Sequence, residues 1–264
     1  AVGYTALSGV TTASNNTAMG IYSGLALTVG NNNAAFGYNT LAADTQGDFN
    51  TAIGFNSLGA QNFTTSTDSY NTAVGAQAGR AITTGKFNNL FGGLAGDALT
   101  TGDSNTAIGY YALTTDTLGE RSVAVGEGAL ATQNFTTETN SYNTAVGYNA
   151  GYASQTATNN TLIGGTAGDA LTTGSFNTAM GAAALTSQTT AAQSVAVGYV
   201  AGYSNVSGAE NTFLGSQTGY ITTGGYNTFV GYHAGIDNTS GAYNTFVGRK
   251  AGFRNSTGLY GVCI

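Results

Sequence analysis

One short phrase, Asn-Thr-Ala-x-Gly, recurs along the whole chain and constrains its fold more than any other feature. Its glycine falls at fifteen places, and most successive glycines lie 17 residues apart. These marker glycines are Gly3, Gly20, Gly37, Gly54, Gly75, Gly92, Gly109, Gly126, Gly147, Gly164, Gly181, Gly198, Gly215, Gly231 and Gly248. A short fixed period is typical of a solenoid, in which each repeat forms one coil and neighbouring coils bury a shared core.

A longer period lies over the short one. Two spacings of 21 residues interrupt the pattern, from Gly54 to Gly75 and from Gly126 to Gly147. The segment QNFTT at residues 61–65 returns at residues 133–137, which is 72 residues later. The middle of the chain is therefore a duplicated block of four coils. Each long coil carries four extra residues, which a solenoid absorbs as a loop on one face.

We number the marker glycine as position five of its coil. Position one is Asn or Ser, position two is mostly Thr or Val, position three is small or apolar, and position four is a larger apolar residue. Such residues favour strands, and the intervening Gly and Asn favour tight turns. The pattern predicts an all-β fold, a parallel β-solenoid of about 17-residue coils, as a single repeat domain over residues 1–264. We expect two extended runs in each coil and a ladder of hydrogen-bonded asparagines at position one.

Position three indicates that more than one chain is present. Successive strand residues point to opposite faces, so positions two and four share one face and position three takes the other. The larger residue at position four is expected to fill the interior. Position three would then face outward, yet it is Ala, Leu or Phe. We therefore expect inter-chain packing there, with Phe213, Phe229 and Phe246 as its aromatic core; the alternative is a small, semi-exposed strand position.

Two variants of the repeat resemble known families. Residues 122–126 and 194–198, both read as SVAVG, resemble the S-V-A-[IV]-G head repeat of YadA-like trimeric autotransporter adhesins. The N-T-A-[VI]-G-x-x-A-[GL] form resembles repeat shafts of phage tail fibres and bacterial surface proteins. The resemblance implies a left-handed β-roll, a homotrimer around one axis, and an extracellular place on a virion tail or bacterial cell surface. The period is longer than that of the adhesin head, so a larger cross-section is expected.

The composition disfavours several classes of function. Only 7% of residues are charged and the net charge is -6, which leaves no basic surface for nucleic acid. No apolar run is long enough to insert this segment into a membrane. The lone His233 has no metal-ligand partners, and no cofactor motif occurs. Asp103 and Glu120 fall at the same place in adjacent coils, but Lys86 does too, which favours a column of mixed surface charges over a catalytic pair. We expect no enzyme.

Four tyrosines directly follow a marker glycine and are candidates for glycan contact: Tyr110, Tyr148, Tyr199 and Tyr232. Aromatic rings stack on sugar faces, although such tyrosines also pack over a coil corner with only the hydroxyl in water. The Thr column is unlike the T-x-T array of ice-binding solenoids, because a large apolar residue stands two places along.

The sequence therefore predicts a structural shaft or adhesive fibre segment of a phage tail fibre or bacterial surface adhesin, which mediates attachment. Both ends fall within a repeat, so we expect a segment of a longer chain. The partners expected are two further copies of the chain and a host surface glycan or receptor. The alternative is a subunit of a self-assembling extracellular filament, driven by unpaired strand edges.

Overall fold

A computed structural model describes all residues from 1 to 264. The fold is all-β, a parallel β-solenoid of about 15 turns with coils of about 17 residues. The predicted fold class is thereby confirmed. The structure contains no helix, and so none that is long and apolar enough to cross a membrane.

The chain divides into two compact units, each built from the same kind of coil. Unit 1 comprises Ala1–Gly128 with Asn134–Asn140, and unit 2 comprises Ala129–Gln133 with Ser141–Ile264. The long-sheet strands of unit 1 are β1 (Thr17–Met19), β2 (Ala34–Phe36), β4 (Thr51–Ile53), β6 (Thr72–Val74), β7 (Asn89–Phe91), β8 (Thr106–Ile108) and β10 (Val123–Val125). Those of unit 2 are β12 (Thr144–Val146), β13 (Thr161–Ile163), β14 (Thr178–Met180), β15 (Val195–Val197), β16 (Thr212–Leu214), β17 (Thr228–Val230), β18 (Thr245–Val247) and β19 (Val262–Cys263).

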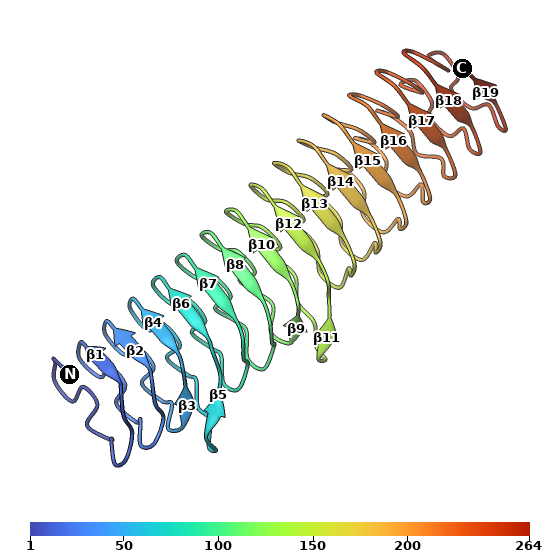
Figure 1. Cartoon of the computed structure of the whole chain (residues 1–264). Coiled ribbons are helices and arrows are strands. Elements are labelled where there is room, and N and C mark those ends of the chain that lie inside the picture. Colours follow the sequence, from blue (N-terminus) through green and yellow to red (C-terminus); the bar gives the residue numbers. More distant parts are fainter. The chain divides into compact units, whose positions relative to one another are not determined.

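Within each unit the strands lie side by side on one face of the coils, in parallel and in register (Figure 1). Like residues stack on like residues: Ala18 pairs with Ala35, and Phe229 pairs with Phe246. The register read from the marker glycines is therefore confirmed. It follows from the equal length of successive coils, which returns the same position to the same place in the stack.

The second extended run is wrong for most coils, because a second strand occurs only beside the four-residue insertions. There β3 (Gly47–Asp48) pairs with β5 (Thr67–Asp68), and β9 (Gly119–Glu120) pairs with β11 (Thr139–Asn140). Elsewhere the Thr-rich run bends. The backbone N–H groups of Thr83 and Gly85, for example, both donate to the carbonyl oxygen of Thr100. A strand ladder does not share an acceptor in this way.

Positions three and four face the opposite way from the prediction. Phe213 and Phe229 are completely buried within their own chain, and Phe246 is buried too. Met19 at position four is instead 52% exposed. The prediction that Phe213, Phe229 and Phe246 pack against another chain is therefore wrong. It assigned the larger side chain to the interior, whereas the interior of so small a coil has room for a large residue only where the opposite position gives way.

Positions three and nine fill that interior together. Ala52 at position three lies in the same coil as Leu58 at position nine, and both are fully buried. Where position three is Phe, position nine is Gly. A Cβ atom on Gly235 would lie only 2.4 Å from the ring of Phe229. Volume lost at one position is thus regained at the other, which keeps the core close-packed.

The marker glycine lies where two coils come very close together. Gly20 has φ of +133°, a conformation that L side chains rarely adopt. A Cβ atom there would also lie 2.3 Å from the carbonyl oxygen of Gly37, the marker of the next coil. Glycine is therefore required at this corner for two independent reasons.

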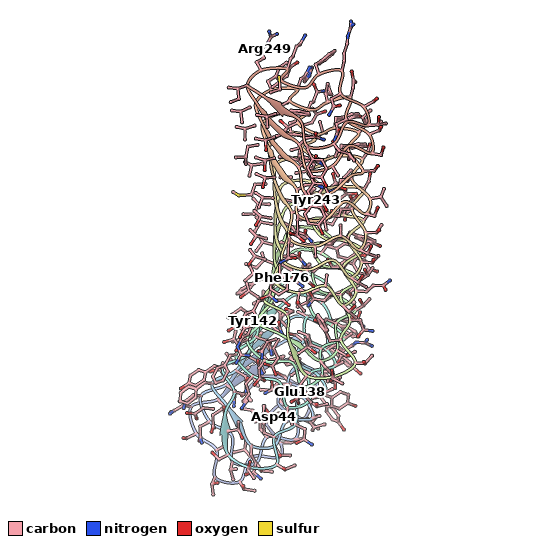
Figure 2. The ribbon with its side chains drawn as sticks, turned by 90° about the vertical axis from the view of Figure 1, so that its right-hand side faces the viewer. Asp44, Glu138, Tyr142, Phe176, Tyr243 and Arg249 are labelled. Carbon is pink, nitrogen blue, oxygen red and sulfur yellow. The ribbon has the colours of Figure 1, made fainter.

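A buried carboxylate anchors the first insertion. Asp44 is fully buried (it is labelled in Figure 2) and accepts hydrogen bonds from Gln61 Nε2 at 2.7 Å and from the backbone N–H groups of Gly47 and Phe63, both at 3.1 Å. Burial raises the pKa of the Asp44 carboxyl above its ordinary value, and this outweighs the hydrogen bonds, which lower it. Asp116 accepts equivalent bonds from Gly119 N and Phe135 N in the second long-coil region.

The raised pKa predicts how stability depends on pH. A carboxyl with a raised pKa binds its proton more tightly in the folded chain than in the unfolded chain. Its contribution to stability is fully present below the unfolded pKa, near 4, and is lost as pH rises through the higher folded pKa. We expect the free energy of unfolding of the natural chain, relative to Asp44→Asn, to increase as pH falls from 7 toward 4. Urea unfolding at several pH values measures it; a difference that stays constant, or decreases, contradicts the assignment.

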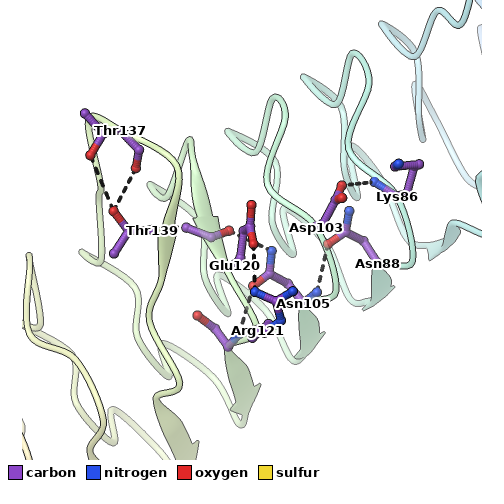
Figure 3. A network of polar contacts seen from close by, with 10 residues as sticks. Lys86, Asn88, Asp103, Asn105, Glu120, Arg121, Thr137 and Thr139 are labelled. Atoms are coloured by element: carbon purple, nitrogen blue, oxygen red, sulfur yellow. Dashed lines mark hydrogen bonds and ion pairs between the residues drawn. The ribbon is translucent and has the colours of Figure 1, made fainter.

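Position one ties each coil to itself and to the next. The Nδ2 group of Asn105 donates to the carbonyl oxygen of Gly119 in the same coil, and its Oδ1 atom accepts from the N–H of Ser122 in the next, both at 2.9 Å. Asn88 likewise accepts from the N–H of Asn105 (Figure 3). Unit 2 repeats the pattern. The predicted asparagine ladder is confirmed, with bonds from side chain to backbone as most of its rungs.

Candidate interaction surfaces

The outward side chains of positions two and four form a surface that we call the sheet face. Its position-two column is mainly Thr, and its position-four column is apolar throughout. In unit 1, position four holds Met19, Phe36, Ile53, Val74, Phe91, Ile108 and Val125. In unit 2, it holds Val146, Ile163, Met180, Val197, Leu214, Val230, Val247 and Ile264. All of these side chains are exposed or half-buried in the single chain.

The sheet face carries no charge. None of the 18 charged residues of the chain occupies position two or position four in either unit. A regular row of exposed apolar side chains without charges is unusual on a surface that faces water, and such patches mark interaction sites. The Thr column is still paired with Val, Ile, Met, Leu or Phe, so the face does not become a T-x-T array.

The four candidate glycan-contact tyrosines are all exposed, as the sequence predicted for a surface column at position six. Tyr110 packs edge-on against Tyr111, with ring centroids 4.1 Å apart. Tyr232 stacks on His233 at 3.7 Å, and Arg249 lies over its ring. Tyr148 and Tyr199 contact no other aromatic ring. The structure thus leaves these rings accessible, and their contact with glycan stays a prediction.

A second aromatic column precedes the position-one asparagine and was not singled out from the sequence. In unit 1, Phe49, Tyr70 and Phe87 stack with centroid distances of 4.9 and 6.1 Å. In unit 2, the stack is Tyr226, Tyr243 and Tyr260, at 4.7 and 5.1 Å; Tyr243 and the same-column Phe176 are labelled in Figure 2. All of these residues have positive φ, which is costly for a bulky side chain. The recurrence of aromatic residues just before Asn was the signal that could have revealed them.

The carboxylates of Asp103 and Glu120 serve the stack and do not face each other as a free pair. Asp103 Oδ1 accepts a hydrogen bond of 2.6 Å from the backbone N–H of Lys86, one coil earlier. Glu120 Oε2 lies 3.1 Å from Arg121 Nη1 (Figure 3). Asn31 plays the role of Asp103 in another coil, since its Oδ1 accepts from the N–H of Ser14. A side-chain oxygen at this position therefore links two coils whether or not it is charged.

The structure holds no group of three or more His, Cys, Asp or Glu side chains arranged to bind a metal ion. No family model, no curated protein and no solved structure matches the chain. The sheet face and the surface columns therefore have to be interpreted from their own chemistry.

Proposed function

We propose that the chain is a structural shaft segment that assembles as a homotrimer through its sheet face. One observation carries the proposal: an exposed, apolar and wholly uncharged column runs along the strands of both units. The revised side-chain orientation thus supports the multi-chain arrangement at positions two and four, in place of position three.

The sheet face fits a second copy of the chain better than an unrelated partner. Its side chains recur at the strand spacing of about 4.8 Å. Only a partner with the same repeat can place an apolar group opposite every one of them. Copies of one chain also meet without opposed charges, because the face has none. Three copies around one axis, as in the trimeric adhesin heads that the repeat resembles, form a closed assembly with no sheet face left in water.

The proposed role is mechanical, in attachment at a virion tail or bacterial cell surface. Coils joined by backbone hydrogen bonds, asparagine rungs and a close-packed interior make a stiff spacer. Its side columns, with exposed tyrosines, stay outside the assembly and are free to contact a host surface. This account requires no catalytic residue, and it treats the repeats themselves as the functional element.

A charge on the sheet face tests the proposal. We expect Leu214→Asp to shift the chain from trimer to monomer, because the carboxylate would be buried at a contact with no cation to pair it. Sedimentation velocity measures the mass, and circular dichroism checks that the coils remain folded. Phe176→Asp is the matched control: it places the same charge on an aromatic residue that is 60% exposed and outside the sheet face, and it should leave the trimer intact.

Two results would count against the proposal. A folded Leu214→Asp variant with unchanged mass would show that the sheet face is not the contact. An open-ended series of masses in the natural chain, with long fibres in electron micrographs, would favour the self-assembling filament instead.

A further inference from the structure

An open hollow of about 410 Å³ lies on unit 1, away from the sheet-face positions. Its lining residues are Asn56, Gly59, Ala60, Arg80 and Ala81. The hollow exists because the first long coil offers only glycine and alanine at positions ten and eleven, whereas the next coil presents the long side chain of Arg80 beside them. Its volume falls within the range of small-molecule sites.

Arg80 is held in place and still has donors to spare. Its Nη2 atom lies 3.4 Å from Asp97 Oδ2, and the other Asp97 oxygen accepts a bond of 2.6 Å from Thr114 Oγ1. The Arg80 side chain remains 46% exposed, whereas that of Asp97 is largely buried. A guanidinium group has five N–H donors in a planar fork, and one contact of 3.4 Å uses few of them. The free edge is suited to a second carboxylate, bound in bidentate fashion.

Asn56 adds a neutral polar group to the same hollow. Its Oδ1 atom accepts a hydrogen bond of 2.7 Å from Asn39 Nδ2, which fixes the amide and leaves its own Nδ2 donors unused. An oriented amide donor of this kind binds hydroxyl or acetamido oxygens.

Phe55, adjacent in sequence to Asn56, supplies an exposed ring. One face of the ring is stacked against Tyr38, with centroids 5.5 Å apart and planes 9° apart. The next coil carries only Ala76 in the same column, so no large side chain of that column covers the other face. An aromatic face, an amide donor and a guanidinium group in one place match the apolar ring face, the hydroxyls and the acid group of a carboxylated sugar.

The duplicated block provides a natural comparison. In unit 2, the residues equivalent to Gly59, Ala60 and Arg80 are Ala131, Thr132 and Tyr152. The duplicate coils fold in the same way, with a Thr side chain bonded to the aspartate equivalent to Asp97. The arginine is therefore not needed for the coil, and tyrosine is accepted at its position.

We propose that this hollow is a binding site for a sugar unit that carries a carboxylate, such as a uronic or sialic acid. The proposal deepens the attachment role and rests on it for its biological meaning, but the binding itself does not require the trimer. Arg80 binds the carboxylate, Asn56 donates to an oxygen of the sugar, and Phe55 packs against the ring. Single-site affinity is expected to be weak, with several copies on one fibre raising the avidity.

The test compares three small ligands on the purified chain by saturation-transfer and chemical-shift NMR titration. These probes are N-acetylneuraminic acid, glucuronic acid and glucose. We expect at least one of the two acids to bind and glucose to bind at least tenfold more weakly. Arg80→Tyr, which installs the residue found in the duplicate coil, should weaken binding of that acid by about tenfold or more, as the loss of a hydrogen bond to a charged group predicts. Arg121→Gln removes one positive charge elsewhere on unit 1 and should leave binding unchanged.

Equal binding of glucose and both acids, or acid binding that survives Arg80→Tyr, would overturn the assignment of the carboxylate to Arg80. Displacement of the acid by an equal concentration of acetate would overturn the sugar part, since the site would then bind any carboxylate. Absence of binding by both acids would overturn the site altogether. The solution mass of the same samples separates the two proposals: a trimer without acid binding removes only the hollow, whereas acid binding by a monomer removes only the trimeric shaft.

Discussion

Replacing Phe229 by alanine should lower the free energy of unfolding of the surrounding coils by about 3–5 kcal/mol. The side chain is completely buried and stacks on Phe246, with ring centroids 4.8 Å apart. Gly235 lies against the ring and has no side chain to fill the space that the substitution would leave. The loss should therefore fall at the upper end of the range, because the cavity cannot collapse easily. Urea unfolding followed by tyrosine fluorescence, or local hydrogen exchange, measures it.

Phe176→Ala is the matched control, because it removes the same ring from an exposed position in the same unit. It should change the free energy of unfolding by no more than about 0.5 kcal/mol. A small effect of Phe229→Ala on stability, together with a change in solution mass, would show that position three faces another chain after all. For the same reason Phe229→Asp is a poor probe of assembly, since it would place an unpaired charge inside the coil and unfold it.

The second large effect is expected from Asn105→Ala, which should cost on the order of 3 kcal/mol. The substitution leaves the carbonyl oxygen of Gly119 and the N–H of Ser122 without partners in a part of the coil that excludes water. Each buried polar group left unpaired costs about 1–3 kcal/mol. Because the asparagine joins one coil to the next, protection from hydrogen exchange should fall in both coils.

Thr106→Ala provides the comparison, since Thr106 is the next residue along the chain and its side chain lies on the sheet face. It should leave hydrogen exchange in the two coils nearly unchanged. If Asn105→Ala and Thr106→Ala behave alike, the asparagine ladder is not a source of stability, and the regular Asn at position one would need another explanation.

Much of the fold could be predicted from the sequence because the repeat encodes it directly. The spacing of the marker glycines determines which residues stack, and the structure pairs Phe229 with Phe246 as that spacing requires. Asparagine at position one signalled the ladder because few other short side chains combine a donor and an acceptor. The direction of the side chains was harder to predict. A period of two in a three-residue strand separates Ala52 from Ile53 but does not say which of them faces inward.

Side-chain size pointed the wrong way because the interior is shared. Ala52 is small since Leu58 fills the same space, and Phe229 is large since Gly235 leaves space for it. Such compensation links positions six residues apart and becomes visible only when the coil is closed.

The candidate surface residues were partly predictable. A column of Tyr directly after the marker glycine could be read from the sequence, and the rings are exposed. The hollow beside Arg80 could not, because it depends on missing volume at Gly59 and Ala60 and on the nearness of a residue one coil away. A sequence shows which side chains are present, but open space between coils appears only in the folded chain.

Light scattering of the purified, unmodified chain over a range of concentrations tests the central claim most directly. A sheet face that is covered by copies of the same chain predicts a stable mass near three times 26.4 kDa. A folded chain that stays at 26.4 kDa at every concentration would contradict the account, because the apolar sheet face would then lie open to water in the native protein.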